Sequence, residues 1–149
     1  MPHAQQQILE AVRSVLATGA TTAGPRVFLD RVDPLQASEL PALLVEEGGE
    51  GESAEVATVH VLEQRSLAVS VSCVVSHGTT AAADARALGL QVERLLAASP
   101  ALVALASGGV YYTGSRIEIS GEADRLMAAR LQDWRFSYFV RADAPDLPL

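Results

Sequence analysis

Two segments with strictly alternating side chains, between Val56 and Val75, constrain the fold of this chain more than any other feature. The apolar residues that share one parity are Ala57, Val59 and Val61 in the first segment, and Leu67, Val69, Val71, Cys73 and Val75 in the second. A period of two places one face of each segment in a core and the other toward solvent or a partner. We therefore predict a long antiparallel hairpin, with its polar corner at Glu63-Gln64-Arg65.

Composition indicates a single domain over residues 1–149, with 49% hydrophobic residues. The formal charge is −7, and all 11 basic residues are Arg. A negative surface repels phosphate, which argues against tight nonspecific binding to nucleic acid but leaves room for DNA to slide past. The sequence has no signal peptide and no run of membrane-spanning length, so we expect a soluble protein made in the cytoplasm.

The remaining elements follow from periodicity and turn residues. Helices are predicted over 4–17 and from Thr79 or Thr80 to about Ala98, with a short further turn through 102–105. Strands are predicted over 26–32, 42–46, 110–112, 116–120 and 134–140. The aromatic strand, with Trp134, Phe136, Tyr138 and Val140 at one parity, is the best candidate for a central core strand. The tail, 142–149, is expected to be frayed.

Together these elements predict an α+β fold, with a mostly antiparallel sheet of four to five strands and two main helices packed on one face.

The segment from Glu46 to Glu55 holds five Glu and three Gly among its residues, and we predict a mobile acidic loop there. Its Gly48-Gly49-Glu50-Gly51 run superficially resembles a dinucleotide-binding loop. That interpretation fails, because the third glycine position is missing and a strand follows where a helix N-terminus would be needed. A calcium loop fails as well, since the segment has no Asp and lacks the required spacing.

No constellation of residues indicates catalysis, a cofactor or a metal. His3, His60 and His77 lack the spacing of a helix-borne metal site, and zinc would need ligands from distant parts of the chain. Cys73 lies on the apolar parity of its strand, which predicts a buried, reduced thiol. No serine stands in a nucleophile elbow. We therefore predict that the protein is not an enzyme.

Several Arg residues lie beside or within predicted strands. Most are expected to cover sheet edges and pair with the excess acids. Some are expected to reach a Glu of a neighbouring subunit, since the planar guanidinium tolerates partial burial while paired. The candidate subunit or partner contacts are Glu46, Glu47, Glu50, Glu52, Glu55, Arg31 and Arg135.

Taken in order, these features resemble the tail-terminator family of long-tailed bacteriophages, also called minor tail protein U-like proteins. After a leading helix, the matching parts are Val27 to Arg31 followed by Pro34, Leu40-Pro41-Ala42 leading into the strand to Glu46, the hairpin, the Ala-rich helix from Thr80, Ser120-Gly121-Glu122, and Leu131 to Val140. The resemblance covers nearly the whole chain.

The resemblance implies a structural virion protein that forms a hexameric ring on the finished tail tube. Such a ring stops tube polymerisation and joins the tail to the head. The implied partners are copies of this chain, the tail tube protein and a head-completion protein, with DNA only as passing cargo and no membrane. The implied location is the virion tail, after assembly in the bacterial host cytoplasm, and the source can be a free phage or a prophage.

Two alternatives stay open from the sequence. One is another head-to-tail completion or connector protein of similar size. The other is a small cytoplasmic α+β enzyme or ligand-binding protein, which would carry a pocket with converging polar groups.

Overall fold

The computed structural model describes residues 1–56, 61–120 and 126–149. The described elements, in chain order, are α1 (Ala4–Thr18), β1 (Val27–Leu29), a 3-10 turn (Ala37–Glu39), β2 (Ala42–Val56), β3 (Leu62–Ser76), α2 (Ala81–Ala98), α3 (Pro100–Leu105), β4 (Gly109–Ser120) and β5 (Met127–Arg141). The predicted α+β class is confirmed.

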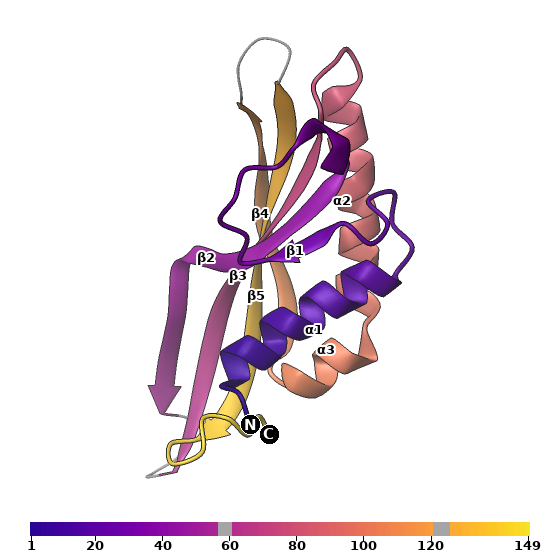
Figure 1. The fold of residues 1–149 in the computed structure, drawn as a ribbon. Coiled ribbons are helices and arrows are strands. Elements are labelled where there is room, and N and C mark those ends of the chain that lie inside the picture. The colour runs from indigo at the N-terminus through magenta and orange to yellow at the C-terminus, as the bar shows by residue number, and fades with distance from the viewer. Residues whose placement is uncertain (57–60, 121–125) are drawn as a thin grey trace.

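The strands form one five-stranded sheet in the order β1-β2-β3-β5-β4. Every neighbouring pair is antiparallel except β1 with β2, which is parallel. The helices lie together on one side of this sheet, and the sheet is long and twisted (Figure 1). The molecule therefore has one helical layer and one sheet layer, which leaves the other face of the sheet without helices.

The helices form where their apolar stripes were predicted. Helix α1 buries Ala4, Ile8, Leu9, Val12 and Leu16, which recur at helical spacing and pack into the common core. His3 caps it, since its Nδ1 accepts a hydrogen bond of 3.1 Å from the backbone N–H of Gln5.

Helix α2 buries Ala85, Leu88, Val92 and Leu96 on one stripe. The chain then turns at Ser99, whose side chain accepts a hydrogen bond from the backbone N–H of Leu102 and so caps α3. The further turn predicted through 102–105 is thus a separate short helix.

The core lies between the helices and strands β3 and β5. Leu67 pairs with Phe136 and Val69 with Trp134, so their side chains point to the same, helix-covered face. Phe136 and Tyr138 are fully buried, in agreement with the aromatic pattern of this strand. Strand β3 is the middle of the five, and β5 lies beside it, so the aromatic strand is inside the sheet, one place from the centre.

Strand β2 corrects two predictions. The segment 46–55 is not a mobile loop: it continues β2 as far as Val56 and pairs with β3. The corner is also not at Glu63-Gln64-Arg65, because Glu63 pairs with Val56 and Arg65 with Ala54. This polar segment has little apolar surface to bury, but its backbone N–H and C=O groups form hydrogen bonds with β3. Those hydrogen bonds allow it to be a strand. The alternation at Ala57 and Val59, and His60, lie outside the described residues.

Strands β1 and β4 differ in smaller ways from the strands predicted by the sequence. Strand β1 covers three residues of the predicted 26–32 and ends before Asp30, which has φ 52°. Strand β4 is continuous, and the interruption expected at Gly114 is a shift in its register with β5 between Tyr112 and Gly114. Gly121 and Glu122 lie outside the described residues.

The tail, expected to be frayed, makes backbone hydrogen bonds. The N–H of Ala4 donates to Pro145 and the N–H of Leu149 to Phe139, at 3.1 and 2.8 Å. In the described parts of the chain, no helix has the length and apolar character needed to cross a membrane.

Candidate assembly surfaces

Two bulges lie at the same level of the sheet. In β2 the register shifts between Glu47 and Glu52, and in β4 it shifts between Tyr112 and Gly114. Glu47 pairs with Val69, and Trp134 pairs with both Val69 and Tyr112, so the bulges stand on either side of β3 and β5. Bulges bend and twist a strand locally. The two together hollow the helix-free face of the sheet.

This hollow has a volume of about 680 Å³. Its charged lining consists of Glu46, Glu47, Glu50, Asp133, Arg116 and Arg135. Arg135 reaches from β5 across β3, where it donates to Ser66 Oγ at 3.3 Å and forms an ion pair with Glu50. Arg116 pairs with Glu118 and Asp133. The hollow therefore carries four acidic and two basic side chains, several of them already paired.

A second cluster ties β2 to the sheet on the helix-covered side. The hydroxyl of Tyr138 donates to Glu52, and Arg65 lies 3.5 Å from the same carboxylate and 2.9 Å from Glu63. Burial raises the pKa of Tyr138, and the hydrogen bond to Glu52 raises it further. Glu52 is thus held inside the protomer.

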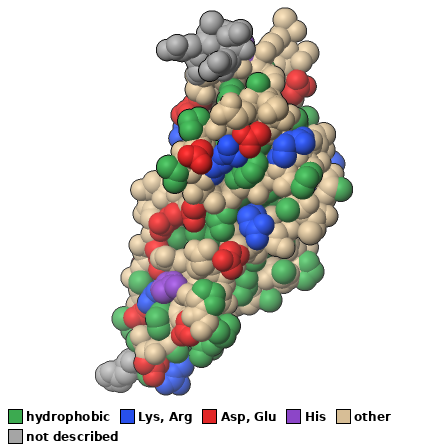
Figure 2. Space-filling view, viewed as in Figure 1, with side chains coloured by type: hydrophobic (Ala, Val, Ile, Leu, Met, Phe, Trp, Pro, Cys, Tyr) green, Lys and Arg blue, Asp and Glu red, His purple; other side chains and the backbone are tan. Residues whose placement is uncertain are grey.

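The acidic candidates therefore divide into two groups. Glu50 and Glu52 form ion pairs within the chain, whereas Glu46, Glu47 and Glu55 are exposed and form no ion pair with any residue that the structure describes. Acidic side chains gather on the side of the molecule where β2 lies (Figure 2). The exposed three are free to meet a partner.

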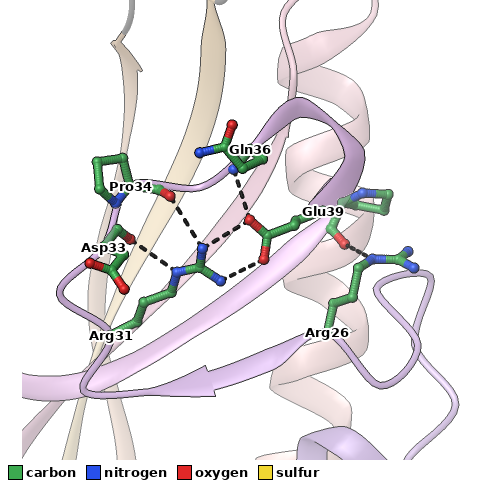
Figure 3. A network of polar contacts seen from close by, with 7 residues as sticks. Arg26, Arg31, Asp33, Pro34, Gln36 and Glu39 are labelled. Atoms are coloured by element: carbon green, nitrogen blue, oxygen red, sulfur yellow. Dashed lines mark hydrogen bonds and ion pairs between the residues drawn. The ribbon is translucent and has the colours of Figure 1, made fainter.

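Arg31 lies apart from the hollow, in the connection between β1 and β2. Its guanidinium donates to both carboxylate oxygens of Glu39 at 2.6 and 2.8 Å, and to the backbone oxygens of Asp33 and Pro34 (Figure 3). It also stacks 4.5 Å above the ring of Phe28. Nearby, Arg26 donates to the Pro41 carbonyl at 2.9 Å. These contacts hold the connection in one shape.

The same network shifts two pKa values. The hydrogen bond from Arg31 lowers the pKa of Glu39, and a hydrogen bond from the backbone of Gln36 lowers it further. The hydrogen bond to Glu39 raises the pKa of Arg31. The pair therefore stays charged at neutral pH, and the next residue, Val32, is 95% exposed.

Among the residues that the structure describes, the sheet has two edges with unpaired backbone. The sequence interpretation expected Arg residues at sheet edges but did not identify which strands form them. Strand β4 is the last in the sheet, so along all of it one edge is without a partner strand in the described chain. On the opposite side, β1 pairs only with Leu43–Val45, so β2 from Glu46 to Val56 has no outer partner among the described residues. The large exposed apolar side chains on β4 are Tyr111, Tyr112, Ile117 and Ile119. The alternation of Arg116, Ile117, Glu118 and Ile119 indicated a strand with two unlike faces, but nothing in the sequence placed that strand at an edge.

The thiol and the metal-binding residue types show no reactive arrangement. Cys73 is buried, as predicted, and burial raises its pKa to about 12. A thiol of that pKa is a poor nucleophile. Within residues 1–56, 61–120 and 126–149, no cluster of three or more His, Cys, Asp or Glu side chains is placed to hold a metal ion.

Comparisons with known proteins give a likeness of fold. No protein-family model matches the sequence, and no curated protein matches it. Among solved structures, one described as "Virion of native gene transfer agent (GTA) particle" contains a chain that superposes with a TM-score of 0.51 and 20% sequence identity. The likeness covers 92% of this chain and 91% of that one. At this identity it shows that the two chains share a fold over nearly their full lengths.

Proposed function

We propose that this protein is a structural component of a phage-like virion, and more specifically the tail terminator, which forms a ring on the end of the tail tube. The observation that carries the proposal is the likeness of fold to a chain of the gene transfer agent virion, over nine-tenths of both chains. The order of elements that resembles the tail-terminator family supports the finer assignment. In this role the chain catalyses nothing and acts through its surfaces.

The charges of the protomer suit a ring around DNA. With a formal charge of −7, the molecule repels phosphate, and an acidic lumen lets DNA pass with little adhesion. A ring also needs two different surfaces on one subunit, because each copy meets the next head to tail. The sheet edges on β2 and β4 differ in charge and apolar character, which fulfils that need.

The candidate contacts take separate roles in this proposal. Among the acidic candidates, Glu46, Glu47 and Glu55 form no ion pair with any residue that the structure describes, so we assign them to the neighbouring copy or the tail tube protein. Glu50, Glu52, Arg135 and Arg31 shape the surfaces through their internal pairs. A head-completion protein is the partner on the opposite side of the ring.

The experiment measures the molar mass by light scattering over a wide concentration range and images the particles by electron microscopy. A hexameric ring that caps tail tubes and limits their length supports the proposal. A ring that joins only the head side would favour another head-to-tail completion protein. A protomer that stays monomeric, alone and with tube protein, would contradict both.

A charge-reversal variant tests the carboxylates. Replacing both Glu46 and Glu47 by Lys is expected to weaken capping of the tube, because exposed acids at the contact become bases. The control is Glu10→Lys on the exposed side of α1, which reverses one charge away from the sheet. Equal capping by both variants would remove the acidic side of β2 from the contact.

A further inference from the structure

We infer that neighbouring copies join by pairing β4 of one subunit with the free outer edge of β2, Glu46–Val56, of the next. This inference rests on the proposed ring and names the strands that build it. Unpaired edge strands offer rows of backbone N–H and C=O groups to another chain, and proteins usually block them with Lys, Pro or short strands. Strand β4 has 12 residues and no Pro, and its register shift lies between Tyr112 and Gly114, so the part from Gly114 to Ser120 pairs regularly with β5 and leaves a continuous outer edge.

The chain directions allow this pairing. Strand β2 is antiparallel to β3, β3 to β5, and β5 to β4, so β2 and β4 run in opposite directions at the two sides of the sheet. If the sheet of one subunit continues into the next, β4 meets β2 antiparallel, like the other long strands. The contact is head to tail, and it gives the proposed ring when the rotation from one copy to the next closes around an axis.

The position of β1 sets the stagger between copies. Strand β1 covers β2 at Leu43–Val45, so an incoming β4 has access only to the part that begins at Glu46. Ile119 of β4 pairs with Ala128 of β5, which pairs with Val75 of β3. Within one subunit, the apolar half of β4 around Ile117 and Ile119 therefore lies at the same height along the strands as the part of β2 that pairs with β1. Each copy must therefore shift along the strands, which tilts them, as closure of a sheet requires.

The side chains favour unlike edges over like ones. Two β2 edges together would bring ten Glu side chains into one contact, five from each copy, which like-charge repulsion disfavours. Strand β4 presents two isoleucines and Arg116, while the far end of β2 presents Ala54, Glu55 and Val56. Val56 is 74% exposed and Ile119 is 60% exposed, so pairing would cover both.

Disulfide trapping tests the inference directly. Ile119→Cys is combined, one at a time, with Ser53→Cys, Ala54→Cys, Glu55→Cys or Val56→Cys. Within one subunit β3 and β5 separate these edges by about 14 Å, from strand spacings of about 4.8 Å. A disulfide needs Cα atoms within about 7 Å, so any bridge must join two copies.

The expected result is a ladder of covalent multimers for at least one pair, and none for a variant that carries only one introduced cysteine, since the native Cys73 is buried. A dimer from Ile119→Cys alone would mean that two β4 edges meet, which would overturn the inference. Rings without cross-links from any of the four pairs would also overturn it, while leaving the proposed function in place. A chain that never assembles would defeat the proposed function as well.

A matched pair of surface variants gives a second measurement. Ile119→Lys is expected to weaken self-association by at least about tenfold, because a charge on a strand edge opposes pairing. Leu90→Lys makes the same kind of change on α2, where Leu90 is 46% exposed, and is expected to leave association unchanged. Equal effects of both, with both proteins folded by circular dichroism, would contradict the role of β4.

Discussion

At the scale of single residues, Gln132 is a polar side chain in the core, where its amide must find hydrogen-bond partners. It is fully buried in β5, on the helix-covered face with Trp134 and Phe136. Its amide nitrogen donates to the Gly89 carbonyl of α2 at 3.0 Å, and its oxygen accepts from the Trp134 indole at 3.2 Å. Gly89 leaves the space for this contact, since a Cβ there would stand 2.7 Å from the Gln132 amide. One side chain thus joins the helical layer to the sheet.

Gln132→Ala is expected to lower the free energy of unfolding by about 1–3 kcal/mol, because it leaves the indole N–H buried without an acceptor. Denaturant unfolding followed by the fluorescence of Trp134 measures the loss. The control is Gln64→Ala, which removes a hydrogen bond to Ser137 Oγ from an exposed residue of β3. Similar losses in both variants would contradict the role given to Gln132.

The ion pair between Arg31 and Glu39 predicts a dependence on pH. Because the pKa of Glu39 is lowered in the folded protein, the pair contributes stability above the unfolded pKa, and this is lost as pH falls through the folded value. Glu39→Gln should therefore lower the melting temperature at pH 7 and have little effect well below about pH 4. Thermal unfolding at several pH values measures this, with Glu10→Gln as the control. A penalty that does not change with pH would exclude the charge as its cause.

At the scale of elements, β2 shows how a polar segment becomes a strand. Its outer half has little apolar surface, yet β3 supplies backbone partners, and Tyr138 and Arg135 hold two of its carboxylates. The bulge accommodates the extra residues between Glu47 and Glu52, and Gly51 there has φ 63°. Only glycine adopts that conformation without strain. Residues 47–53 are thus part of a strand, and point variants test this region without removing it.

Gly51→Ala is expected to destabilise the protein by about 1–2 kcal/mol, the cost of a left-handed backbone for a residue with a Cβ. Gly49→Ala is the matched control in the same bulge, since its φ is not positive and a Cβ there would meet no atom within 4 Å. Chemical denaturation of both variants measures the difference. Equal stability of the two would mean that the bulge relaxes into another shape.

At the scale of the whole molecule, the C-terminal segment connects the helical layer to the end of the sheet. Its backbone accepts hydrogen bonds from Ala4, Gln7 and Ser107, through Pro145, Asp146 and Leu149. These contacts join the start of α1 and the segment after α3 to the end of β5. Both ends of the chain lie close together at the foot of the sheet (Figure 1).

Removing residues 144–149 deletes these hydrogen bonds and is expected to lower the melting temperature by about 2–4 °C. That is the shift that a loss of about 1 kcal/mol produces in a domain of this size. Calorimetry measures the shift, and hydrogen exchange should show faster exchange at the amide of Ala4. An unchanged melting temperature would mean that the tail adds no stability to the fold.

Periodicity alone predicted the helices, the alternating strand β3 and the aromatic strand β5, because their apolar residues repeat at the spacing that buries one face. Burial of Ile8, Leu88, Val71 and Phe136 follows from that pattern. The outer half of β2 could not be predicted in this way, since its strand conformation depends on pairing with β3 and not on its own side chains.

Only the tertiary structure decided where the candidate residues lie. It brings Glu50 to Arg135 and Glu52 to Tyr138, both more than 80 residues away in the chain, and it places Arg31 against Glu39. It also decides which strands stand at the edges, because strand order depends on long-range pairing that no local pattern encodes. Local spacing determines which residues are buried, whereas contacts between distant segments determine which surfaces remain open to a partner.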